Sequence, residues 1–249
     1  MRIYTVILVM IVLVGGVTGV VAELSTEHSV DITGSIDVPA QTIEVPDFGE
    51  ATITEVGKEE AGETLEVSTD VPENESYAIR IFEIVDGDRR FLENEFVEGD
   101  VERRFFLDRY DPGTYIIALT QDGGDTALEV EPFIVKGYTV DQSVSDVTKG
   151  KEIIVDVQLT QVNNGASNPQ VVNTTLFGNG IVRSIEATSA GENSYQANFS
   201  TDDLPTGSYD VYTGVENDDD IYGYNELIGL SDSASVEVKE DSTPTPTST

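Results

Sequence analysis

The chain of 249 residues carries 47 acidic and 13 basic side chains, for a formal net charge of −34, and it contains no cysteine. A polyanion of this kind repels nucleic acid, so nucleic acid is excluded as a partner, and the missing thiols exclude disulfides and thiolate metal sites. Self-repulsion destabilises a compact fold in dilute buffer, whereas about 1 M salt shortens the screening length to about 3 Å. Because hydrophobic residues make up 39% of the chain, the composition favours a folded, salt-adapted protein over disorder.

Residues 1–22 have the layout of a secretory signal peptide. Arg2 is followed by an uncharged apolar run over 3–22 that ends in Val20, Val21 and Ala22, which fit a cleavage site. We expect cleavage after Ala22, with residues 23–40 as a linker. The alternative is an uncleaved anchor, because a helix over this run spans about 30 Å, the thickness of a bilayer core. Both alternatives place the rest of the chain outside the cytoplasm, extracellular or at the cell surface. Only an uncleaved segment would contact the membrane.

The body of the chain shows the period-two alternation of β-strands. The runs 77–85, 152–162 and 194–199 alternate in this way, and no helical apolar pattern exceeds about two turns. The pairs Asp86-Gly87, Gly123-Gly124 and Asn179-Gly180 lie between such runs and are typical of hairpin turns. The pattern predicts an all-β fold with about seven strands in each half.

Two sequence phrases recur in the same order and indicate a tandem repeat. "DPGTY" at 111–115 is matched by "PTGSY" at 205–209, which places Tyr115 and Tyr209 94 residues apart. "GETLEV" at 62–67 is matched by "GKEIIV" at 150–155, 88 residues further on. Each glycine before the tyrosine is expected to supply a positive φ. The tyrosine phrase looks like the tyrosine corner of immunoglobulin-like sandwiches, in which the phenol bonds to backbone across a turn.

These observations together predict the domain organisation. We expect two tandem immunoglobulin-like β-sandwiches, over 41–136 and 137–240, because each half is then close to the roughly 100 residues of such domains. A single larger sandwich or barrel is the alternative. Residues 241–249 alternate Thr and Pro and predict an extended C-terminal stalk that can carry sugars.

The sequence holds few groups that could carry catalysis. His28 is the only histidine, so a histidine-based triad or metal cluster is excluded. Motifs of serine hydrolases, phosphate-binding loops and zinc proteases are missing. With 47 acidic residues, the spacing of carboxylates carries no information. We therefore expect no enzyme, with an exported hydrolase that uses two carboxylates as an alternative.

The densest acidic cluster lies near the end of the second predicted sandwich. Glu216, Asp218, Asp219 and Asp220 fall within five residues, and calcium requires several such oxygens that converge from a loop. They are the candidate ligands of a calcium site, although in a uniformly acidic chain a solvated hairpin loop is the favoured interpretation. No other cofactor is expected.

Three asparagines begin the sequon for N-linked glycosylation. They are Asn74, Asn173 and Asn198. Because the chain is expected to be exported, we predict that a sugar is attached at one or more of these sites.

The acidic composition, the signal-like start, the tandem β units and the Thr/Pro stalk together resemble cell-surface proteins of halophilic archaea. These include glycoproteins associated with the surface layer and built from immunoglobulin-like modules. The resemblance implies a non-catalytic structural or adhesive role, with other cell-surface proteins or the surface layer as partners. The alternative is a module that binds carbohydrate or calcium through loops of the second domain.

Overall fold

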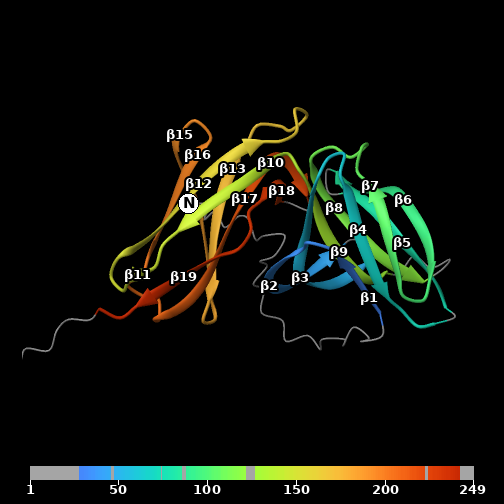
Figure 1. Cartoon of the computed structure of the whole chain (residues 1–249), viewed down its shortest axis with the longest axis horizontal. Helices are drawn as coiled ribbons and strands as arrows, with labels where there is room; N and C mark the ends of the chain where they lie inside the picture. The colour runs from blue at the N-terminus through green and yellow to red at the C-terminus, as the bar shows by residue number, and fades with distance from the viewer. Residues whose placement is uncertain are drawn as a thin grey trace, which may run out of the picture.

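The computed structural model describes residues 28–45, 48–73, 75–85, 88–121, 127–221 and 224–241 (Figure 1). Their regular structure consists of β-strands, with no helix among them. A search of the same residues for a helix able to cross a membrane finds none. The fold is all-β, as predicted, and consists of two β-sandwiches in tandem. The predicted signal or anchor segment 1–22 and residues 242–249 of the stalk lie outside the described residues.

The first sandwich consists of two sheets. The smaller sheet has the order β1-β4-β7, with β1 (Ser29–Ile32), β4 (Thr64–Asp70) and β7 (Val101–Phe106). The larger sheet has the order β2-β3-β9-β8-β5-β6, with β2 (Ile36–Val45), β3 (Gly49–Glu60), β9 (Ala127–Lys136), β8 (Gly113–Gln121), β5 (Ser76–Val85) and β6 (Asp88–Glu98).

The second sandwich also consists of two sheets. One has the order β10-β12-β16-β15, with β10 (Tyr138–Val144), β12 (Glu152–Gln161), β16 (Ser194–Ser200) and β15 (Thr188–Gly191). The other has the order β11-β19-β17-β13-β14, with β11 (Val147–Thr148), β19 (Ala234–Lys239), β17 (Gly207–Ile221), β13 (Val171–Gly178) and β14 (Ile181–Glu186). The strand β18 (Tyr224–Leu230) forms a hairpin with β17.

The two sandwiches use one strand plan. In each, an early strand pairs in parallel with the last strand, β3 with β9 and β11 with β19. In each, the last strand then pairs with the strand that begins after the tyrosine turn, β8 or β17, which pairs with β5 or β13. The repeated sequence phrases therefore mark equivalent strands. The first sandwich adds β2 and the part of β3 that pairs with it, and the second adds β15 and β18.

Both predicted tyrosine corners are present. The Tyr115 hydroxyl donates to the backbone oxygen of Asp111 at 2.8 Å, and the Tyr209 hydroxyl donates to that of Pro205 at 2.8 Å. Each ring is 1% exposed. Four residues separate donor and acceptor in both cases, so each hydrogen bond closes the turn that leads into the strand.

The two corner glycines have different roles. Gly207 has a φ of 140°, as expected for a turn that needs glycine. Gly113 has no positive φ, so the expectation there was wrong. A Cβ atom at Gly113 would lie 2.4 Å from the Glu226 carboxylate, which comes from the second sandwich. Glycine is required at 113 for space, because the Glu226 carboxylate occupies the place where a side chain would lie.

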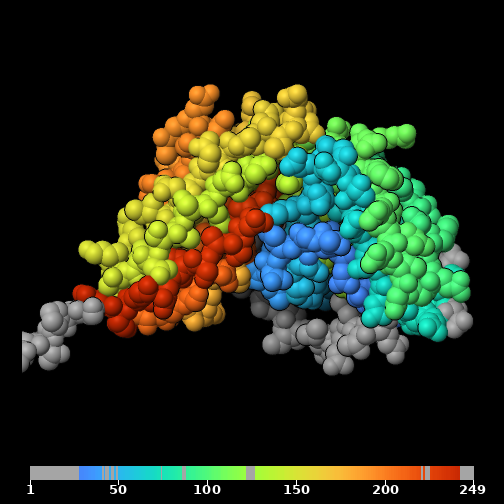
Figure 2. Space-filling model, viewed as in Figure 1, coloured from blue at the N-terminus to red at the C-terminus, as the bar shows by residue number. Residues whose placement is uncertain are grey.

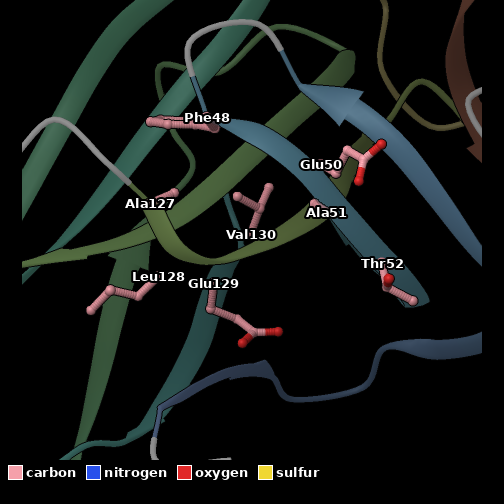
Figure 3. Close-up of a pocket in the computed structure, with 8 residues that line it drawn as sticks. All are labelled: Phe48, Glu50, Ala51, Thr52, Ala127, Leu128, Glu129 and Val130. Atoms are coloured by element: carbon pink, nitrogen blue, oxygen red, sulfur yellow. The ribbon is translucent and has the colours of Figure 1, made fainter. Parts of the chain in front are cut away.

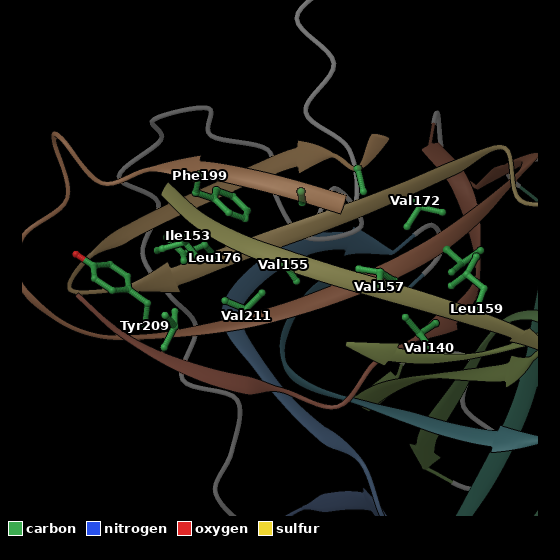
Figure 4. Packing of buried hydrophobic residues seen from close by; sticks show 14 of the residues in the cluster. Val140, Ile153, Val155, Val157, Leu159, Val172, Leu176, Phe199, Tyr209 and Val211 are labelled. Atoms are coloured by element: carbon green, nitrogen blue, oxygen red, sulfur yellow. The ribbon is translucent and has the colours of Figure 1, made fainter. Parts of the chain in front are cut away.

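Each sandwich has its own apolar core between its sheets. In the second sandwich, residues of β12, β16, β13 and β17 meet in the middle, among them Val155, Phe199, Leu176 and Val211 (Figure 4). In the first, the inward residues of β8, Tyr115, Ile117 and Leu119, pack against β1, β4 and β7. The alternation predicted for 152–162 is confirmed, because β12 alternates exposed and buried residues along most of its length.

A third apolar core joins the two sandwiches. It is built on the outer face of the β9-β8-β5 sheet, where Ile116 and Ala118 of β8 lie next to β5 and β9 side chains. The β2–β3 hairpin covers part of this face, and Tyr212, Ile221 and Leu230 of the second sandwich cover another part. The space-filling view shows the two halves in contact along this side (Figure 2). We call this set of residues the junction core.

Replacement of a corner tyrosine by phenylalanine is expected to destabilise the protein. Tyr115→Phe and Tyr209→Phe each remove a buried hydroxyl and leave a carbonyl without its partner, which costs on the order of 1 kcal/mol. Tyr212→Phe is the matched control, because the buried Tyr212 hydroxyl has no hydrogen-bond partner among the described residues. Urea unfolding followed by circular dichroism should show a loss for the two corner variants and no loss for the control. Equal losses in all three variants would contradict the corner assignment.

Candidate functional site

The predicted calcium loop is part of a long hairpin at the junction of the two sandwiches. β17 continues for 15 residues to Ile221, and β18 returns beside it. β18 packs on β8 and β9 of the first sandwich, and it lies between the two halves in Figure 1. The acidic stretch 216–220 therefore belongs to a structural element that contacts both sandwiches.

Glu226 of β18 connects the second sandwich to the first. Its Oε1 accepts a hydrogen bond from the Thr114 backbone amide at 3.0 Å, and its Oε2 accepts one from the Asn217 amide at 2.7 Å. The Thr114 hydroxyl donates to the backbone oxygen of Leu227 at 3.1 Å. These bonds form where Gly113 leaves room for the carboxylate. Glu226 is 8% exposed, and burial raises the pKa of its carboxyl to about 7.

Glu216 of β17 is held in a similar way on the next stretch of the hairpin. Its two oxygens accept hydrogen bonds from the side-chain amides of Asn173, at 3.1 Å, and Asn225, at 3.2 Å. Its side chain is buried, and burial raises the pKa of this carboxyl also to about 7. Two side-chain amides thus satisfy the oxygens of Glu216.

The structure describes the surroundings of two of the other predicted calcium ligands. Asp218 is exposed, and Asp219 accepts a hydrogen bond from the Asn217 amide at 2.8 Å. The side chain of Asp220 lies outside the described residues. Among the residues that the structure does describe, no group of three or more acidic or histidine side chains is placed to hold a metal ion. Calcium binding by this stretch stays a prediction.

The three sequons have different surroundings. Asn198 on β16 is exposed, which is the orientation that a glycan needs. Asn173 is 3% exposed and its amide donates to Glu216. The folded chain has no room for a glycan there, so the structure argues against the predicted modification at Asn173. Asn74 lies outside the described residues.

One buried carboxyl was not found from the sequence. Glu131 on β9 is 6% exposed, and its Oε1 has no hydrogen-bond partner among the described residues. Burial, together with the charges of Glu55, Glu129 and Asp31, raises the pKa of its carboxyl to about 9. The sequence "LEVEPF" did indicate that these two acids lie near each other, because a strand places the alternating Glu129 and Glu131 on one face.

A small cavity lies between the β2–β3 hairpin and the start of β9 (Figure 3). Its volume is about 20 Å³, which is room for about one water molecule and too small for an organic substrate. The lining residues are Phe48, Glu50, Ala51, Thr52, Ala127, Leu128, Glu129 and Val130.

Comparison with known proteins finds structural likeness at low sequence identity. No family model and no curated protein matches the chain. The chain is similar to the crystal structure of the chicken CNTN1 FN1-FN3 domains, with 12% identity and a TM-score of 0.29, over 74% of this chain and 65% of that one. It is also similar to trypsin-activated alpha-2-macroglobulin from Escherichia coli, with 10% identity and a TM-score of 0.30, over 74% and 15%. The chain thus spans less than two thirds of either protein, and at these TM-scores the likeness carries no conclusion.

Stability is expected to fall as the pH rises through neutrality. Glu131, Glu216 and Glu226 have folded pKa values of about 9, 7 and 7, against 4.5 for an unperturbed glutamate. A raised folded pKa contributes stability that is complete below the unfolded pKa and is lost as the pH rises through the folded one. We expect the free energy of unfolding to drop by about 2 kcal/mol or more from about pH 5 to pH 8.

The variant Glu131→Gln tests the largest contribution. It should flatten the pH dependence of urea unfolding, whereas Glu102→Gln, at an exposed position on β7, should leave the slope unchanged. Parallel slopes for both variants and the wild type would show that Glu131 is ionised in the folded protein.

Gly113→Ala tests the contact between the sandwiches. The new Cβ atom would displace the Glu226 carboxylate and leave the Thr114 amide without its partner, at a cost of roughly 2 kcal/mol. Glu226→Gln keeps the shape and one acceptor oxygen, so its loss should be smaller. Thermal unfolding by calorimetry provides the comparison, and a Gly113→Ala variant as stable as the wild type would refute the proposed steric role.

Proposed function

We propose that this protein is a non-catalytic structural or adhesive component of the cell surface of a halophile. In this role the two sandwiches act as one rigid element that holds a fixed shape between the surface and its partners, other cell-surface proteins or the surface layer. The proposal rests first on the junction core.

The junction core supports a rigid element rather than two tethered domains. Tyr212, Ile221 and Leu230 of the second sandwich are at most 5% exposed and pack against the first. Their separation from it would expose three large apolar side chains, at roughly 2 kcal/mol for each. The Thr114 hydroxyl of the first sandwich also donates to the backbone oxygen of Leu227 at 3.1 Å, and Lys58 forms an ion pair with Asp232 at 2.5 Å. Polar bonds therefore flank the apolar contact.

The location rests on the sequence features at the two ends of the chain, and cell fractionation tests it. In cells that express the protein natively, it should be found in the envelope fraction, and protease added to intact cells should digest it. A cytoplasmic marker protein of similar size serves as the control. Recovery of the intact chain with that marker after protease treatment would overturn the proposal.

The salt adaptation predicts a strong dependence of stability on salt. Folding brings the like charges of a chain with net charge −34 closer together, and about 1 M salt screens them beyond about 3 Å. We expect unfolding or marginal stability below a few tenths molar NaCl, and a melting temperature that rises by at least about 10 °C up to about 2 M. Circular dichroism during thermal unfolding measures it.

Sucrose provides the control for the salt series. Like salt, sucrose is excluded from the protein surface and strengthens apolar burial, but it does not screen charge. At matched osmolality it should raise the melting temperature much less than NaCl. A melting temperature that does not change between about 0.05 and 3 M NaCl would show that the acidic surface is no adaptation of the fold to salt.

A further inference from the structure

The strand β6 ends the larger sheet of the first sandwich, on the side away from the second sandwich. It pairs with β5 along one edge, and the opposite edge pairs with no strand in the part of the chain that the structure describes. β6 lies at the rim of the molecule in Figure 1. An open edge strand of 11 residues is a template for a further strand, which proteins commonly block.

A bulge gives β6 a particular row of outward-facing side chains. The register with β5 shifts between Ile81 and Phe82, so that Leu92 is left without an opposite residue. As a result, one face of β6 carries the residues that lie opposite Ser76, Ala78, Arg80, Phe82 and Ile84, and these are Glu98, Phe96, Asn94, Phe91 and Arg89 in that order. Two of them are large exposed apolar side chains, Phe91 at 53% and Phe96 at 61%.

This row is self-complementary about its centre. In chain order it consists of a cation, an aromatic ring, an amide, an aromatic ring and an anion. We propose that β6 pairs antiparallel with β6 of a second copy of this chain, about a twofold axis at Asn94. The larger sheets of two molecules then form one continuous sheet.

The pairing places complementary groups opposite one another on this face. Asn94 lies opposite Asn94 of the second copy, Phe91 opposite its Phe96, and Arg89 opposite its Glu98. Aromatic and opposite-charge pairs at directly opposed positions stabilise antiparallel strands, and a twofold axis provides each pair twice. The bulge is essential to this match, because without it Leu92 rather than Phe91 would lie opposite Phe96.

The surroundings of the row fit a second copy. Phe91 packs edge-on against Phe82 with ring centroids 5.8 Å apart, so the apolar surface of the junction core continues to the open edge. The Arg89 guanidinium lies 3.8 Å above the Phe48 ring, which holds its charge on this face. On the other face, Arg90 and Glu95 form ion pairs with Glu83 and Arg103 inside the same molecule.

Arginine is concentrated around this edge. Six of the eight arginines fall between positions 80 and 109, on and around β5, β6 and β7. The same range also holds nine acidic residues, so two copies with a charge of −34 each still repel one another at this edge. High salt reduces the remaining repulsion, so the pairing should strengthen as salt rises.

Cysteine cross-linking tests the register, because the chain has no thiol of its own. Asn94→Cys places one thiol of each copy at the twofold axis, where the Cα separation of opposed strand residues fits a disulfide. Val182→Cys, at a 47% exposed position on the edge strand β14, is the matched control. At about 2 M NaCl, oxidation should link Asn94→Cys into a covalent dimer at least about tenfold faster than Val182→Cys. A mixture of Phe91→Cys and Phe96→Cys should form the mixed dimer preferentially.

Sedimentation equilibrium of the wild type gives the second measurement. It should show a dimer at about 100 µM protein in about 2 M NaCl. The variant Glu98→Arg places an arginine opposite Arg89 of the other copy on both sides of the twofold axis, and it should weaken the dimer about tenfold or more. A wild type that remains monomeric under these conditions overturns the proposal. So does a dimer in which Asn94→Cys cross-links no faster than Val182→Cys, because the copies then meet through another surface.

Discussion

The burial of β8 on both faces is the constraint on which the rest of this structure depends. Its residues from Gly113 to Thr120 are all buried. Tyr115, Ile117 and Leu119 face the core of the first sandwich, while Ile116 and Ala118 face the junction core. In a solitary sandwich the second face would be in contact with water, and such strands then alternate apolar and polar residues. Because β8 does not alternate in this way, other parts of the chain must cover the outer face of its sheet. The β2–β3 hairpin and the extended β17–β18 hairpin provide this cover.

The hydrogen bonds of the β17–β18 hairpin are a consequence of its position on this buried face. A hairpin that lies on a buried face carries backbone and side-chain polar groups out of water, and each needs a partner. Glu226 and Glu216 accept hydrogen bonds from amides on three different strands and from the Thr114 backbone. The acidic stretch that resembles a calcium loop in sequence thus contains a buried hydrogen-bond acceptor, Glu216, and two exposed acids, Asp218 and Asp219.

The sequence predicts the parts of this structure that are local. The tyrosine corners, the strand class and the tandem repeat follow from turn chemistry and period-two alternation, both of which act over a few residues. The junction core was not predicted, although "YIIAL" at 115–119 is apolar at every position, which is a signal for burial on both faces. Gly113 was assigned to the turn because no local signal reports that Glu226 occupies its side-chain space. For the same reason, the sequon at Asn173 looked available when its amide is in fact bonded to Glu216.

The two hairpins that cover the outer face of the sheet do not reach β6. The apolar face of the junction core therefore continues, uncovered, to the open edge. The apolar face extends from Ile116 of β8 through Phe82 of β5 to Phe91 of β6. The first two lie beneath the hairpins and are at most 5% exposed, whereas Phe91 is 53% exposed. An apolar surface that continues past its cover costs solubility unless something else occupies it. In a chain with 47 acidic residues, two phenylalanines that are more than half exposed lie on this strand between an arginine and a glutamate. The second copy that we propose at β6 would complete on that side the burial that the hairpins provide over β8.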